Sequence, residues 1–202
     1  MVGVTERFVT AAGAALQGDV DLEATIATIP TSFTTKGMFF TRYVAALGAE
    51  WEELLPALID PAKHGRYHAF ESYPMRDYVR LFERVARARF PGSTREAFRL
   101  LARGEVEVFS ESTLGKVTFA LLRDPGATLL RYPDIFKVIM RGPSSAARRV
   151  GERCVAVTYP HYHGSIEQGI GLLEGLVQIF DEEPRVEATV EPDRRVTFGV
   201  SW

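Results

Sequence analysis

The stretch that decides the fold is Ser165–Phe180, SIEQGIGLLEGLVQIF. Its apolar residues recur at steps of three and four, which predicts a helix with one apolar face; they are Ile166, Ile170, Leu173, Val177 and Phe180. Gly171 and Gly175 stand four residues apart inside this pattern, and each should cost about 1 kcal/mol relative to alanine. We therefore expect another segment of backbone to approach the helix closely at these two glycines.

Strands are predicted on both sides of this helix. After it, apolar residues alternate with polar ones from Val186 to Val190 and again from Val196 to Trp202, with a Pro192-Asp193 turn between them. Before it, Cys154–Thr158, CVAVT, reads as a third strand. The order of many helices, then strand, helix, strand, strand indicates an α+β fold in which helices pack on a small antiparallel sheet.

The segments upstream are mostly helical in pattern. Three helices are expected at 21–29, 34–47 and 74–89. A fourth should begin at Ser93, which forms a capping-box pattern with Glu96, and a short fifth helix should contain Phe136 and Met140. Gly104 reads as a break after the fourth. We predict a single domain over 1–202, with 1–30 as an N-terminal helical extension and 74–202 as its core.

Composition excludes several classes of protein. The chain has 202 residues and a net charge of −2, so no overall field attracts nucleic acid or an anionic membrane. The single cysteine rules out an internal disulfide and fits a reducing compartment, and we expect a cytoplasmic protein. The first 19 residues have neither the basic cluster of a signal peptide nor the length of a membrane span.

Three segments resemble a known family. They are Lys36-Gly37-Met38-Phe39-Phe40, Ala102-Arg103-Gly104 with Phe109 and Gly115, and Gly171-Leu172-Leu173-Glu174-Gly175 with the closing Val200-Ser201-Trp202. Together they are similar to a paralogous family of myxobacterial proteins known only as a domain of unknown function. The resemblance extends from Ile29 to Trp202.

From Tyr78 onward the chain also resembles, more distantly, the haem nitric-oxide-binding domain, the vinyl-reductase-type sensors and the trafficking-complex subunits. That group implies helices and an antiparallel sheet around an internal pocket, and sensing, binding or assembly rather than catalysis. Its haem branch needs an axial histidine on the helix that corresponds to Asp134–Arg141, and that segment, DIFKVIMR, has none. The haem branch also binds the haem propionates with a Tyr-x-Ser-x-Arg motif. This chain keeps the tyrosine as Tyr159 but has His161 and His163 in place of the serine and the arginine. We therefore expect the fold without haem or another cofactor.

The resemblance places a ligand pocket between sheet and helices. We predict that Phe109, Val117, Phe136 and Met140 line it and that Tyr159, His161 and His163 form its rim.

The histidines form two close pairs. His64 and His68 are four apart, and His161 and His163 are two apart, which would place each pair on one face of a helix or strand. Such pairs can bind zinc, but no Cys-x-x-Cys or His-Glu-x-x-His motif accompanies them. We favour histidines in surface loops and expect no metal.

Other reactive residues have structural explanations. Cys154 reads as a buried, inert thiol, Ser165 as an N-cap completed by Gln168, and Glu174 as a solvated or intersubunit carboxylate. Lys116 lacks the glycine and hydroxyl residues of a phosphate loop. Arginines recur from position 80 to 103, and we expect them to pair with Asp and Glu on a solvated face, with an acidic partner as the alternative.

Three functions remain open from the sequence. The leading hypothesis is a non-catalytic regulatory module that binds a small apolar ligand or a protein partner. The alternative is a structural or assembly protein that acts as a homodimer, with its contact at the hairpin or at the face carrying Gly171 and Gly175. The third, which we favour least, is a metal enzyme that uses the histidine pairs.

Overall fold

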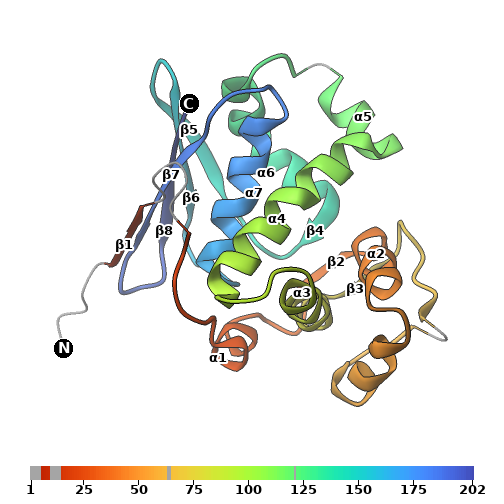
Figure 1. Cartoon of the computed structure of the whole chain (residues 1–202). Coiled ribbons are helices and arrows are strands. Elements are labelled where there is room, and N and C mark those ends of the chain that lie inside the picture. Colours follow the sequence, from red (N-terminus) through yellow and green to blue (C-terminus); the bar gives the residue numbers. More distant parts are fainter. Residues whose placement is uncertain (1–5, 10–14, 63–64, 121) are drawn as a thin grey trace.

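The computed structural model of the chain describes residues 6–9, 15–62, 65–120 and 122–202, and Figure 1 shows how they are arranged. Within them the main sheet is antiparallel and has the strand order β1-β7-β8-β6-β5. Its strands are β1 (Glu6–Val9), β5 (Ala146–Gly151), β6 (Cys154–Tyr159), β7 (Arg185–Val190) and β8 (Val196–Ser201). The three strands predicted from alternation are thus confirmed as β6, β7 and β8, while β1 and β5 extend the sheet at its two edges.

Helix α7 (Ile166–Gln178) lies against this sheet, and α4 (Thr94–Glu111) packs along α7 (Figure 1). The two glycines of α7 allow this packing. A Cβ atom on Gly171 would lie 2.0 Å from the backbone oxygen of Arg99, and one on Gly175 would lie 2.7 Å from that of Arg103. The expected close approach of another backbone is confirmed, and it comes from α4 of the same chain.

A second sheet, with the order β3-β2-β4, lies beside the remaining helices. It consists of β2 (Thr34–Lys36), β3 (Ser72–Pro74) and β4 (Met140–Arg141). Helices α2 (Gly37–Leu47) and α3 (Met75–Arg89) lie against it, and the 3-10 helix η1 (Gly48–Ala57) packs on these two helices. The backbone N–H of Gly37 donates to the oxygen of Glu71 at 2.9 Å, and a Cβ atom at Gly37 would lie 2.2 Å from the oxygen of His68. Only glycine therefore fits where the 66–72 connection crosses α2.

The N-terminal extension contains a strand as well as a helix. Strand β1 pairs with β7, and α1 (Leu22–Ala27) begins at Asp21, whose side chain accepts from the N–H of Ala24. The intervening residues bind the start of α4, because the N–H of Leu16 donates to Glu96 at 2.8 Å and Ser93 donates to the oxygen of Leu16 at 2.7 Å. The predicted capping box is therefore wrong. Ser93 occupies the N-cap position, but its hydroxyl binds the N-terminal extension and makes no capping hydrogen bond to α4.

Two predicted helix boundaries are also wrong. Helix α4 continues through Gly104 to Glu111, so this glycine does not break it. Helix α6 (Pro125–Ile139) is longer than expected and contains Pro133. It begins early because Asp124 caps it: the Asp124 side chain accepts a hydrogen bond from the N–H of Ala127 at 2.8 Å. Between them, α5 (Thr113–Phe119) turns away sharply at Gly115, where a Cβ atom would lie 1.7 Å from the oxygen of Phe109.

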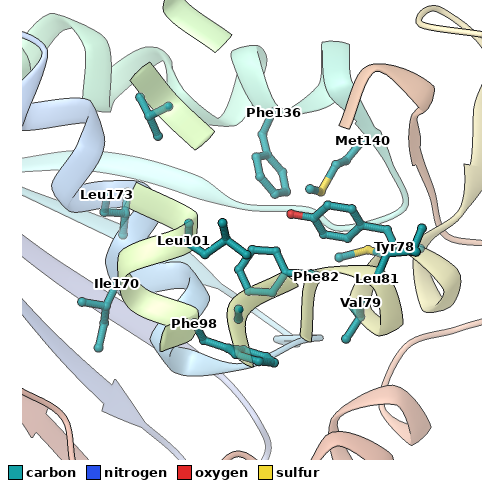
Figure 2. Packing of buried hydrophobic residues seen from close by; sticks show 14 of the residues in the cluster. Tyr78, Val79, Leu81, Phe82, Phe98, Leu101, Phe136, Met140, Ile170 and Leu173 are labelled. Atoms are coloured by element: carbon teal, nitrogen blue, oxygen red, sulfur yellow. The ribbon is translucent and has the colours of Figure 1, made fainter. Parts of the chain in front are cut away.

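The core is continuous between the helices and the main sheet. Figure 2 shows part of it, with Phe82 and Phe98 meeting between α3 and α4 at a ring distance of 5.0 Å. Ile170 and Leu173 of α7 are 1% exposed, and Phe198 of β8 is fully buried. The α+β prediction is confirmed. In the part of the chain described, no helix combines the length and the apolarity that crossing a bilayer requires.

Candidate functional site

A partly open cavity of about 40 Å³, here called the apolar cavity, lies where helices α2, α4, α5, α6 and α7 meet. The atoms exposed on its wall are all apolar; they come from Phe39, Val106, Phe109, Phe119, Ile135, Phe136, Ile139, Leu172 and Leu176 in the main. One water needs about 10–15 Å³ measured in this way, so the space exceeds that of a single water. Water would find no hydrogen-bond partner on this wall.

A second cavity of about 20 Å³, the tyrosine cavity, lies next to the first. Its lining includes Tyr159, Tyr162, His163 and Gln168, together with Met75 and Met140. Both cavities share three lining residues, Tyr132, Phe136 and Leu172. These side chains form the partition between an apolar chamber and a chamber with a polar edge.

The partition contains a buried pair of tyrosines. The hydroxyl of Tyr159, on β6, donates to that of Tyr132, on α6, at 2.7 Å. Burial raises the pKa of both hydroxyls, so both remain protonated at neutral pH. The pair therefore joins the sheet to α6 without charge.

A buried carboxyl group, Glu105 on α4, lies beside the apolar cavity. Tyr78 donates to its two oxygens at 2.8 and 3.0 Å, and Tyr43 donates to Oε1. The side-chain amide of Gln168 in turn donates to the Tyr78 hydroxyl at 2.8 Å. Four helices, α2, α3, α4 and α7, thus converge on one polar cluster inside the core.

Burial raises the pKa of Glu105 to about 7, because desolvation disfavours the carboxylate more than the two tyrosine hydrogen bonds and the more distant Arg42 favour it. Burial also raises the pKa values of Tyr43 and Tyr78 well above their ordinary range. Glu105 is therefore the group in this cluster that changes charge near neutral pH.

This cluster was not predicted from the sequence, although the sequence contained one signal of it. Glu105 falls on the apolar stripe of α4, at helical spacing from Phe98, Leu101 and Phe109. A carboxylate in such a position needs buried hydrogen-bond donors. Nothing in the spacing of the sequence indicated that Tyr43 and Tyr78 would supply them.

Most of the predicted pocket residues lie at the two cavities. Phe109 lines the apolar cavity, Phe136 lines both, and Met140, Tyr159 and His163 line the tyrosine cavity. The other two do not. Val117, on α5, is 72% exposed, because α5 turns away from the core at Gly115. His161 is exposed on the connection between β6 and α7.

The expectation that His161 and His163 share one face of a strand is wrong. Strand β6 ends at Tyr159, so both histidines lie in the connection that follows it. The His163 ring contacts the backbone oxygen of Thr28 through Nδ1 and packs edge-on against Phe33 at 5.0 Å. Of the first pair, His68 is exposed and His64 lies outside the described residues. No group of three or more His, Cys, Asp or Glu side chains arranged for a metal occurs in the described ranges.

Glu174 is not the solvated or intersubunit carboxylate that we expected. It is 1% exposed and accepts two hydrogen bonds from Arg99, at 2.8 and 2.9 Å, across the α4–α7 contact. Arg80, Arg84, Arg87 and Arg95 also have acidic partners within the chain, as the preferred interpretation of the arginine row predicted. Ser165 caps α7 as predicted, but the Gln168 side chain binds Tyr78 and does not complete a capping box. Cys154 is only half-buried.

The residues around the cavities do not fit a haem. Helix α6 has no histidine to serve as an axial ligand of iron. The Tyr132–Tyr159 pair and Phe136 occupy the interior, and the two cavities of about 40 and 20 Å³ are far smaller than the roughly 300–1,000 Å³ of a site for an organic ligand or cofactor. Tyr159, at the tyrosine position of the Tyr-x-Ser-x-Arg motif, binds another tyrosine, and His163, at its arginine position, binds the backbone.

The chain belongs to the family DUF2378, described as a protein of unknown function, whose model matches residues 29–202. The resemblance found in the sequence is thereby confirmed. No curated protein matches the chain in sequence.

Solved structures of H-NOX proteins share the fold. An unliganded Fe(II) form of the K. algicida H-NOX protein with an alanine-to-glycine mutation has a TM-score of 0.62 and 16% identity, over 82% of this chain and 95% of that one. An isoleucine-to-phenylalanine mutant of T. tengcongensis H-NOX has a TM-score of 0.59 and 20% identity, over 82% and 96%. A structure from a study of heme distortion in the H-NOX family has a TM-score of 0.60 and 18% identity, over 83% and 94%.

Proposed function

We propose that this member of the DUF2378 family is a non-catalytic regulatory module that binds a small apolar ligand in the apolar cavity, without haem. The observation that carries this proposal is a partly open apolar pocket lined by five helices of an H-NOX-type fold. H-NOX-type architecture suits a sensor or ligand-binding module, and the interior of this chain differs from a haem site in having no histidine on α6.

The size of the cavity limits the ligand. A space of about 40 Å³ suits a molecule of a few heavy atoms and excludes larger ones unless side chains move. The wall offers dispersion contacts and no hydrogen bonds, so it selects an apolar molecule over water. Rotation of Phe136, which lines both cavities, would join them into a longer chamber with Tyr159 and Gln168 at its polar end.

Regulation requires that the ligand favour one arrangement of the helices over another. Phe39 of α2, Phe109 of α4, Phe136 of α6 and Leu176 of α7 all face the apolar cavity, so a ligand there contacts four elements at once. The polar groups nearest the cavities are already bound to one another, as Tyr132 to Tyr159 and Glu105 to Tyr78. This arrangement favours binding over catalysis.

Xenon and benzene are suitable first probes, because both are apolar and small. Saturable methyl shifts in NMR spectra, or density inside the cavity in xenon-pressurised crystals, are expected for the wild type. Ile139→Phe should fill the cavity and abolish the response. Val138→Phe is the matched control, since Val138 neighbours Ile139 on α6 but is 47% exposed, and it should leave binding intact.

Two results would refute the proposal. One is a cavity that takes up neither probe in the wild type. The other is stoichiometric haem, seen as a Soret band in protein purified from cells supplied with haem precursor.

A further inference from the structure

Gly104 lies in the interior of helix α4 without a packing reason inside the described chain. A Cβ atom at Gly104 would meet no described atom within 4 Å, whereas one at Gly171 or Gly115 would collide with backbone. Glycine in the middle of a helix lowers its stability relative to alanine. The space above Gly104 is therefore open at a position where a side chain would be both tolerated and favourable.

Gly104 forms part of the floor of an open groove of about 410 Å³ between α4 and the end of α7. Leu100 precedes it by four residues and Val108, which is 38% exposed, follows it by four, so the three share one face of the helix. Ile179, just after α7, lines the groove on its other side. The outer face of α4 thus has an apolar stripe with a gap at its centre.

Arg103 and Glu107 also line this groove, and they carry opposite charges. Neither takes part in an ion pair within the described residues, whereas the preceding arginines of α4 do: Arg95 binds Glu167 and Arg99 binds Glu174. The stripe is therefore flanked by one unpaired cation and one unpaired anion, four residues apart on the same helix.

We propose that this face of α4 binds the same face of a second copy of the chain, with the two α4 helices antiparallel and crossing at Gly104. In that arrangement Leu100 of each copy lies opposite Val108 of the other. Arg103 lies opposite position 105 of the other copy, and its long side chain extends about 3 Å along the helix axis to Glu107 of that copy. The missing side chain at Gly104 lets the two backbones approach closely, as small residues do where helices cross. The interface is isologous, so each contact occurs twice.

Charge favours a second copy over an unrelated partner. A surface with one cation and one anion at this spacing is complementary to itself when the helices run antiparallel, whereas a uniformly acidic or basic partner would meet a like charge. The proposed surface also differs from the Gly171/Gly175 face considered from sequence, because α4 of the same chain already covers those glycines.

Sedimentation velocity of the full chain over a wide range of concentration tests the proposal. The wild type should dimerise, and Gly104→Leu should weaken dimerisation by about tenfold or more, because the new side chain holds the helices apart. The melting temperature of the Gly104→Leu monomer should not fall, since nothing lies above Gly104. This second measurement separates loss of the interface from loss of the fold.

Charge reversal provides an independent test. Arg103→Glu alone and Glu107→Arg alone should each weaken the homodimer, and mixing the two variants should restore a heterodimer, because opposite charges then face each other at both contacts. Arg89→Glu, on the exposed end of α3, is the matched control and should leave dimerisation unchanged. A chain that is monomeric at every concentration overturns the proposal. A dimer that is insensitive to Gly104→Leu and to both charge reversals also overturns it.

Discussion

Glu105 should make the stability of this protein depend on pH in an unusual direction. Its carboxyl group is buried and has a pKa of about 7 in the folded protein, against an ordinary value of 4.5 in the unfolded chain. Glu105→Gln keeps the shape of the side chain and its capacity for hydrogen bonds with Tyr43 and Tyr78, but it removes the titration. The difference in unfolding free energy between wild type and variant therefore isolates this one group.

The sign follows from proton binding. Because the pKa is higher in the folded state, the folded protein retains a proton that the unfolded chain loses first as the pH rises. The stabilisation is complete below about pH 4.5 and is lost as the pH rises through about 7. At about 1.4 kcal/mol for each pH unit, the wild type should lose roughly 2–3 kcal/mol relative to Glu105→Gln between pH 5 and pH 8.

Urea unfolding of both proteins at several pH values from 5 to 8 measures this difference. Glu111→Gln is the matched control, since Glu111 lies on the same helix but is exposed, and the difference of this variant from wild type should not change with pH. Tyr78→Phe removes the donor that bonds both carboxyl oxygens, so it should raise the pKa of Glu105 and move the loss of stability to higher pH.

A difference between wild type and Glu105→Gln that stays constant from pH 5 to pH 8 would refute the reasoning. A wild type that gains stability relative to the variant as the pH rises from about 3 to 5, with no change above pH 5, would show that the tyrosine hydrogen bonds outweigh desolvation. In that case the carboxylate would be the favoured form of Glu105 in the core.

Three further predictions concern the α4–α7 contact, and thermal or urea unfolding checks each of them. Glu174→Ala should destabilise the protein by about 3–5 kcal/mol because it leaves Arg99 buried without its bidentate partner, whereas the double variant Arg99→Met/Glu174→Leu should recover most of that loss. Gly171→Ala should destabilise the protein by more than about 2 kcal/mol, because its Cβ atom would lie 2.0 Å from a backbone oxygen of α4. Gly104→Ala should stabilise the protein by up to about 1 kcal/mol. Equal effects of the two substitutions would contradict the packing described. Ser165→Ala should cost about 1 kcal/mol through the lost N-cap of α7, and an unchanged midpoint would mean that the cap contributes nothing.

Local patterns were sufficient for the elements at the C-terminal end of the fold. The three- and four-residue spacing in α7 and the alternation in β7 and β8 are properties of neighbouring residues, and they predicted the right elements. The predictions failed where a distant segment competes for a local signal. Ser93 has the sequence of a capping residue, but its hydroxyl binds the backbone of Leu16, some 77 positions away.

The candidate site shows the same division. Phe109, Phe136 and Tyr159 could be placed near a pocket from their apolar patterns and from the family resemblance. Val117 could not, because its position depends on the turn that Gly115 imposes between α4 and α5. Two residues of α4 depend on tertiary packing in the same way: Glu105 received no prediction, and Gly104 was wrongly predicted to break the helix. Their roles depend on the fact that Glu105 faces two tyrosines in the core and Gly104 faces open space.

The amino-acid sequence alone was enough to predict an α+β protein with a glycine-bearing helix on an antiparallel sheet, and to show that the α6 segment offers no histidine to a haem iron. Both conclusions depend only on residue identity and on the spacing of neighbouring residues. Tertiary packing was needed to bury the ion pair of Glu174, to bring two tyrosines to Glu105 and to leave small cavities between the helices. Burial and charge environment arise from segments far apart in the chain, so no local pattern specifies them.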